Sequence, residues 1–186
     1  MDIKEAIYSR RATREFSRAP IDEDVIRQLI DAAIQAPSAM NQQPWSFSVV
    51  RDQDVMARIS GESKAHMLKT TPAGLLSHHF EQILNDTAFN IFYSAPALIV
   101  ICSASVPWAI EDCALAAENL MLTAHAAGLG TCWIGFAQAW LGTPAGKSLL
   151  KLPAEITPMA PIIVGHPKAA PAPVPRKRPE IRWIGA

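Results

Sequence analysis

Three arginines near the start of the chain could hold an anion. Arg10, Arg11 and Arg14 fall within five residues. Crowding their charges costs free energy unless an anion joins them, and the rigid fork of a guanidinium group suits phosphate and carbonyl oxygens. A solvated basic turn is the commoner origin of such a cluster. The cluster therefore predicts an anion site only if other segments supply further contacts.

Two later segments carry groups that can contact a ligand. Residues 36–45 read Ala-Pro-Ser-Ala-Met-Asn-Gln-Gln-Pro-Trp and are dense in hydroxyl and amide side chains, which both donate and accept hydrogen bonds. Residues 128–136 read Gly-Leu-Gly-Thr-Cys-Trp-Ile-Gly-Phe, and glycines there let the backbone approach a ligand closely. Either segment alone is also compatible with an ordinary connection between elements.

Apolar periodicity and turn residues predict the elements that position these segments. Helices are expected over residues 2–9, 22–36, 53–60, 108–127 and about 142–151, with another ending near residue 92. Strands are expected over residues 45–50, 96–102 and 156–164. Pro158 and Pro161 limit the last strand or place part of it at a sheet edge. This order predicts one layered domain over residues 1–186, of α+β or mixed α/β class.

Two regions do not follow these periodic patterns. Residues 61–90 hold scattered glycine and proline and the pair His78-His79, and we expect a mobile excursion, or lid, over the core. Residues 167–179 are rich in proline among basic residues, which predicts an extended tail. Because the tail ends in an apolar segment, residues 167–186 are expected to dock on a second subunit.

Composition and charge exclude several classes of partner. The chain has 186 residues, of which 49% are hydrophobic and 18% charged, and its formal net charge is zero. Neither a nucleic acid nor a membrane is therefore expected as a partner. The charge is uneven, however, because residues 1–18 hold five basic and three acidic residues, and residues 168–186 hold five basic and one acidic residue. Both basic ends could meet at one anion.

Few features point to catalysis by a side chain. The sequence has no dinucleotide-binding glycine motif, no P-loop and no zinc-protease motif. Its three cysteines show no Cys-x-x-Cys spacing, which argues against a disulfide framework and a metal site. Cys132 and His125 are expected to serve packing and structure. No apolar leader or membrane-length apolar run is present, so a cytoplasmic location is expected.

Together the segments resemble the nitroreductase family. The shared motifs are Arg-Arg-x-x-Arg-x-Phe at residues 10–16, Ala-Pro-Ser-x-x-Asn-x-Gln-Pro-Trp at 36–45, Gly-Leu-Gly-Thr-Cys-Trp-Ile-Gly at 128–135, and a basic Pro-Arg-Lys-Arg-Pro at 175–179. They occur in the family's order. The resemblance implies an α+β fold with a central mixed sheet flanked by helices, and an intertwined homodimer. It also implies FMN at each of two interface sites, with NADH or NADPH as electron donor.

The resemblance further implies which residues bind the flavin. The arginine cluster would contact its phosphate, ribityl chain and pyrimidine edge, residues 37–41 would reach it from the partner subunit, and the backbone of residues 134–135 would donate to the N5 side of the ring. Ala12 stands where the family often has serine, so only its backbone remains for binding. The implied cofactor-binding residues are Arg10, Arg11, Ala12, Arg14, Pro37, Ser38, Ala39, Asn41, Trp133, Ile134, Gly135, Arg176 and Arg178.

The function implied by the resemblance is that of an FMN-dependent oxidoreductase. FMN would accept a hydride from NAD(P)H and pass electrons to a nitroaromatic, a quinone or a related electrophile, with ping-pong kinetics. The protein would supply position and electrostatic field, so no catalytic side chain is required. Three alternatives stay open, namely a reductive dehalogenase, a flavin-fragmenting enzyme and a non-catalytic flavin-binding protein.

Overall fold

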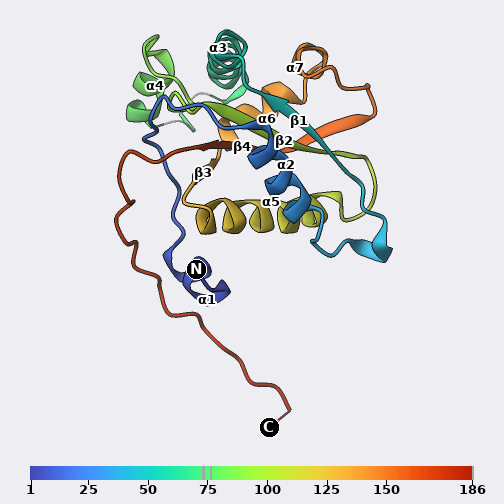
Figure 1. Cartoon of the computed structure of the whole chain (residues 1–186). Helices are drawn as coiled ribbons and strands as arrows, with labels where there is room; N and C mark the ends of the chain where they lie inside the picture. The colour runs from blue at the N-terminus through green and yellow to red at the C-terminus, as the bar shows by residue number, and fades with distance from the viewer. Residues whose placement is uncertain (73, 76, 186) are drawn as a thin grey trace.

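A four-stranded sheet lies between two layers of helices (Figure 1). The computed structural model describes residues 1–72, 74–75 and 77–185, so Ala73 and Leu76 of the predicted excursion and Ala186 of the tail lie outside the described residues. The strands follow the order β1-β2-β4-β3, and each neighbouring pair is antiparallel. Their bounds are β1 (Trp45–Val50), β2 (Ala97–Ala104), β3 (Gly130–Trp133) and β4 (Ile156–Gly165).

The residues of β2 alternate between two buried clusters, one on each face of the sheet. Ile99 belongs to the cluster that contains residues of α2 (Glu23–Ala33) and α5 (Ala109–Ala126). Leu98 belongs to the cluster that contains residues of α3 (Gln53–Thr70) and α6 (Gly135–Leu141). Burial on both faces explains why this strand is a continuous apolar run. The other helical elements are α1 (Ile3–Ser9), η1 (Ala39–Asn41), α4 (His78–Asn85) and α7 (Pro144–Leu149).

The α+β class predicted from the sequence is confirmed, and the strand at residues 45–50 is observed with the predicted bounds. The prediction of a mixed sheet is wrong for the described strands, because each neighbouring pair is antiparallel. A parallel pairing occurs only as the isolated bridge between Ala12 and Thr131 in the described part of the chain.

Two helix predictions also need correction. The helix expected to end near residue 92 ends at Asn85. The helix expected over residues 53–60 continues to Thr70, because Gly61 lies on an exposed face of α3 and does not interrupt it. The glycine-rich segment 128–136, which the sequence leaves open as an ordinary connection, holds both the strand β3 and the first residues of α6. Helix α6 is seven residues long and packs on α3, so it depends on a tertiary contact that local periodicity does not reveal.

The prolines of β4 lie where this strand has a single neighbour. Strand β3 pairs only with residues 162–165 of β4, so residues 156–161 pair with β2 alone. Pro158 lies opposite Cys102 at a shift in the register between β2 and β4. Because proline has no N–H to donate, Pro158 and Pro161 suit a bulge and a partly unpaired edge, as the sequence predicts.

The C-terminal residues 167–185 run along the outside of the molecule as an extended tail (Figure 1). A bridge between Phe16 and Pro167 ties the start of the tail to the N-terminal segment. Near its end, Trp183 and Ile184 are 84% and 96% exposed. In the described part of the chain, no helix is long and apolar enough to cross a membrane.

A close packing contact joins the N-terminal segment to β3. The Thr13 N–H donates to the Thr131 carbonyl oxygen at 2.9 Å, and Thr13 is buried. A Cβ atom at Gly130 would lie 2.5 Å from Thr13 Oγ1 and 2.7 Å from Thr13 Cβ. Only glycine therefore fits at position 130 while the N-terminal segment keeps its place.

Gly130→Ala should lower the free energy of unfolding by about 1–3 kcal/mol, because the added methyl group overpacks a buried contact. Urea denaturation followed by circular dichroism measures the loss. The loss should shrink in a Thr13→Gly background, where the obstructing side chain is absent. An equal loss in both backgrounds would contradict this contact.

The matched control for that substitution is Gly61→Ala. A Cβ atom at this helical glycine would meet nothing within 4 Å. Alanine in a helix interior should therefore raise the free energy of unfolding by about 0.5–1 kcal/mol relative to glycine.

Candidate functional site

The N-terminal arginine segment is held between β3 and the start of the tail. Ala12 bridges to Thr131 of the edge strand β3. A few residues later, the Ser17 N–H donates to the His166 carbonyl oxygen at 2.8 Å. These two attachments fix the path of residues 12–17, and with it the position of Arg14 beside the end of β3.

A cavity of about 260 Å³ opens where β3 gives way to α6. The guanidinium carbon of Arg14 lies 6.0 Å from the centre of the Tyr93 ring, which is a cation–π distance. Gly135 has no side chain and is exposed, and a Cβ atom there would meet nothing within 4 Å, so its backbone is open to a ligand. The walls therefore combine a cation, aromatic rings and accessible backbone. The lining residues are Arg14, Tyr93, Cys132, Trp133, Ile134, Gly135 and Phe136.

The structure brings Arg14 together with residues 133–135, as the sequence analysis expects, but it changes the set of available donors. The Ile134 N–H donates to the Pro161 carbonyl oxygen at 2.8 Å and is therefore engaged within the fold. The Gly135 N–H, at the first position of α6, has no acceptor among the residues that the structure describes. Gly135 is thus the better candidate for a backbone bond to a ligand.

A second cavity, of about 280 Å³, continues along the same segment toward the tail. It lies between residues 12–15 and residues 169–172, and Arg14 lines both cavities. Ala12 offers no polar side chain, and Thr13 is buried, so the charged groups of the second cavity are the exposed side chains of Arg14 and Glu15. Arg176 and Arg178 lie exposed further along the tail and do not line either cavity.

The other two arginines of the cluster are held by α5 and by their own backbone. Arg10 Nε is 3.8 Å from Glu118 Oε1. The guanidinium group of Arg11 donates to the carbonyl oxygens of Tyr8 and Arg10, at 2.9 and 2.6 Å, and its Nε is buried without a partner among the described residues. The arginine cluster is therefore anchored on one side to its own backbone and on the other to α5.

His125, in the last turn of α5, also holds this segment. The Ser9 hydroxyl donates to the Glu5 carbonyl oxygen at 2.6 Å, so it accepts from His125 Nε2 at 2.7 Å. Burial lowers the pKa of His125, and the charges of Arg10 and Arg11 lower it further. A neutral imidazole that donates to Ser9 agrees with the structural role expected for this histidine.

The hydroxyl- and amide-rich loop lies at the opposite end of α5. Asp112, in the first turn of this helix, is 3% exposed, and its Oδ1 accepts from the Ala39 N–H at 2.9 Å. Its Oδ2 is buried without a partner in the described part of the chain. Met40, Asn41 and Gln43 have left-handed φ values of 51°, 55° and 48°. Such conformations cost free energy outside glycine, and they cluster at functional sites.

The length of α5 separates the two groups of predicted binding residues within one chain. Asp112 and His125 are 13 positions apart, which places them about 20 Å apart along a straight helix. Figure 1 shows η1 at one end of α5, and the N-terminal segment at the other. The structure therefore does not bring residues Pro37, Ser38, Ala39 and Asn41 to the cavity of Arg14 in the same chain.

Three residues of this region were not predicted as part of a site. Tyr93 and Phe136 line the cavity beside Arg14, and Asp112 positions the loop at residue 39. The sequence does not single out Asp112, because Glu111 beside it is also acidic and acids are common in the first turn of a helix. The two aromatic residues carry no signal in the sequence either.

The cysteine thiols are poor nucleophiles in this fold. Burial raises the pKa of Cys132, against an opposing effect of Arg14 and Arg10. Burial also raises the pKa of Cys102 to about 12 and that of Cys113 to about 11. Because the thiolate is the reactive form, the packing role expected for Cys132 agrees with its surroundings.

Comparisons with known proteins agree with this arrangement. The model of the Nitroreductase family matches residues 7–166 of the chain. A candidate NADH dehydrogenase/NAD(P)H nitroreductase of Archaeoglobus fulgidus is 31% identical over 168 residues, which are 87% of this chain and 83% of the relative. The FMN reductase (NAD(P)H) of Bacillus subtilis is 25% identical over 184 residues, which are 94% of this chain and 70% of the relative.

The fold has close counterparts among solved structures. A nitroreductase with bound FMN from Desulfitobacterium hafniense superposes with a TM-score of 0.83 at 22% identity, and the match covers 99% of both chains. This likeness shows that the layered arrangement of sheet and helices is shared over the whole length of the two chains.

Asp112→Ala should release the Ala39 N–H from protection against hydrogen exchange. A hydrogen bond to a charged group contributes roughly 1.5–3 kcal/mol, so exchange at Ala39 should accelerate about tenfold or more. Asp112→Asn keeps an oxygen acceptor and should preserve most of the protection. Exchange followed by NMR measures the rates, with the exposed neighbour Glu111→Ala as control. Unchanged exchange in Asp112→Ala would show that this carboxylate does not hold the loop.

Proposed function

Because this chain belongs to the nitroreductase family and is therefore an oxidoreductase, we propose that it binds FMN between two copies of the chain. We further propose that it transfers electrons from NADH or NADPH to a small electrophile. The observation that carries the proposal is the cavity in which Arg14, Tyr93 and the backbone of Gly135 meet. The FMN reductase among its relatives supports the choice of cofactor and donor.

The residues around this cavity fit a flavin. The cluster of Arg10, Arg11 and Arg14 supplies positive charge for a phosphate and for ring carbonyl oxygens. The open space at Gly135 leaves room for a flat ring against the backbone. The polar groups of Ser38 and Asn41, which face no flavin cavity in their own chain, would reach the ring from the partner copy.

Exposed apolar side chains support the pairing of two copies. Ile3, Ile7 and Tyr8 on α1 are each more than half exposed, and so are Trp183 and Ile184 on the tail. Contiguous apolar surface of this kind marks interaction sites. In the proposed homodimer the tail crosses to the partner, where Arg176 and Arg178 complete the phosphate contacts.

The chemistry of the proposed reaction belongs to the cofactor, and the chain provides its setting. FMN, when bound, supplies hydride acceptance from the nicotinamide and electron donation to the acceptor. Arg14 places a fixed positive charge at the cavity, where it favours negative charge on a ring edge. Tyr93 and Phe136 form apolar walls that limit access of water. Donor and acceptor must both reach the same ring of the bound flavin, so they should enter in turn.

This alternation predicts ping-pong kinetics with nitroaromatic or quinone acceptors. Protein purified with excess FMN should retain the flavin in a one-to-one ratio with the chain, and NADH or NADPH should bleach its absorbance under anaerobic conditions. Retention without bleaching would identify a flavin-binding protein without this activity. Failure to bind at saturating FMN would contradict the proposal.

The roles of the two basic ends can be separated with FMN and riboflavin. Arg14→Ala should weaken the binding of both flavins about tenfold or more, because Arg14 is proposed to face the ring. Arg178→Ala should weaken the binding of FMN by a similar factor. It should hardly change the binding of riboflavin, since riboflavin lacks the phosphate. Fluorescence titration of the apoprotein measures both affinities.

The control for this titration is Arg27→Ala. Arg27 is an exposed arginine of α2 that pairs with Glu23, and its loss removes the same charge away from the cavity. It should change neither affinity. If Arg14→Ala and Arg178→Ala behave like this control, the basic ends are ordinary solvated termini.

A further inference from the structure

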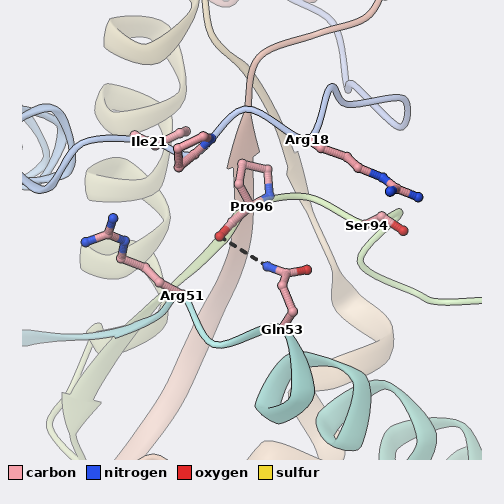
Figure 2. Close-up of a pocket in the computed structure, with 7 residues that line it drawn as sticks. Arg18, Ile21, Arg51, Gln53, Ser94 and Pro96 are labelled. Atoms are coloured by element: carbon pink, nitrogen blue, oxygen red, sulfur yellow. Dashed lines mark hydrogen bonds between the residues drawn. The ribbon is translucent and has the colours of Figure 1, made fainter.

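A third cavity, of about 580 Å³, shares no lining residue with the two already described. Three chain segments form it, namely the linker before α2, the turn between β1 and α3, and the residues that precede β2 (Figure 2). Ile21 and Pro96 provide apolar surface, whereas Arg18, Arg51, Gln53 and Ser94 provide polar groups. The cavity therefore offers both contact area and hydrogen-bond donors to a ligand.

Gln53 fixes the floor of this cavity. Its side-chain Nε2 donates to the carbonyl oxygens of Ala95 and Pro96, each at 3.3 Å. These bonds join the start of α3 to the residues before β2, and Figure 2 shows the bond to Pro96 across the floor. The segments that carry Arg51 and Ser94 are thereby held together.

The two arginines give the cavity its charge. Arg18 and Arg51 are exposed, and neither forms an ion pair within 4.0 Å in the part of the chain that the structure describes. No acidic residue lines the cavity among the described residues. Figure 2 shows Arg18 on the side of Ser94, and Arg51 on the opposite side of Pro96 and Gln53. Two separated cations suit a ligand with two separated anionic groups.

Two short stretches of the chain connect this cavity to the proposed flavin site. Ser94 directly follows Tyr93, which lines the flavin cavity together with Arg14. Arg18 follows Arg14 by four residues, which span at most about 14 Å of extended chain. The side of the cavity that carries Arg18 and Ser94 is therefore nearer to the flavin than the side that carries Arg51.

From this placement, and resting on the function proposed above, we infer that the cavity binds the phosphate groups of the pyridine dinucleotide donor. Arg18 contacts the pyrophosphate, which both NADH and NADPH carry and which lies nearer to the nicotinamide. Arg51 contacts the 2′-phosphate of the adenosine, which only NADPH carries. Guanidinium groups bind phosphate oxygens through paired donors, so the protein prefers NADPH.

The reductive half-reaction of the FMN-loaded protein tests this assignment. Stopped-flow bleaching of the flavin at increasing nucleotide concentration gives an apparent Kd for each donor. Arg51→Ala should raise the apparent Kd for NADPH about tenfold, as expected for loss of one charge-assisted contact, and should leave that for NADH nearly unchanged. Arg18→Ala should raise both. The effects should weaken at high salt, because exposed charges are screened.

Arg58→Ala is the matched control, because Arg58 is an exposed arginine of α3 that does not line the cavity. It should leave both apparent Kd values unchanged, and all three variants should keep their FMN and their reduction by dithionite. If Arg18→Ala and Arg51→Ala behave like Arg58→Ala while the wild-type flavin is reduced normally, the inference is wrong and the proposed function stands.

Calorimetric titration with adenosine 2′,5′-bisphosphate tests the cavity without any turnover. The wild-type protein should bind this probe, and Arg51→Ala should weaken the binding about tenfold. If neither NADH nor NADPH reduces the bound flavin, the proposed function fails, and this titration still decides whether the cavity is a phosphate site. Equal binding of the probe by wild type and Arg51→Ala would overturn the assignment of Arg51.

Discussion

The rigidity of one long helix, α5, limits where the candidate binding residues can lie. Its first turn holds the loop at residue 39 through Asp112, Glu118 in its middle pairs with Arg10, and its last turn holds the end of α1 through His125. About 20 Å of helix separates Asp112 from His125, and a helix packed against a core does not bend enough to bring its ends together. In the proposed function, one chain therefore presents two half-sites. The proposed second copy of the chain is the element that would join them.

The half-site beside β3 consists mostly of backbone that the sheet edge holds in place. Residues 12–17 attach to β3 and to the start of the tail, Gly130 admits this close approach, and Gly135 leaves open space where the strand turns into α6. The thiols nearby are buried and hard to ionise. A site of charge, aromatic walls and an available backbone N–H group, without a reactive side chain, suits a reaction whose chemistry a cofactor carries.

Local patterns in the sequence were enough to predict β1, β2 and α5. The apolar run of β2 follows from its burial on both faces, whereas α5 buries one face and leaves Ile110 and Leu115 exposed, and β1 is only half-buried. Antiparallel pairing, the continuation of α3 past Gly61 and the short helix α6 depend on contacts between distant segments, which periodicity does not encode. Residue types identified the arginine cluster and the amide-rich loop. The distance between these two groups of residues could not be predicted from the sequence, because it depends on the length and placement of α5.

The most direct test of the composite site is a complementation experiment with two variant chains. One chain carries Arg10→Ala and Arg14→Ala, and the other carries Ser38→Ala and Asn41→Ala. Each variant alone should lose FMN, since every site in its homodimer lacks one half. In a co-expressed heterodimer, one site receives both mutated halves and the other receives both intact halves. The FMN content of the purified heterodimer should therefore return to half that of the wild-type dimer. A heterodimer without FMN would contradict a site shared between two copies.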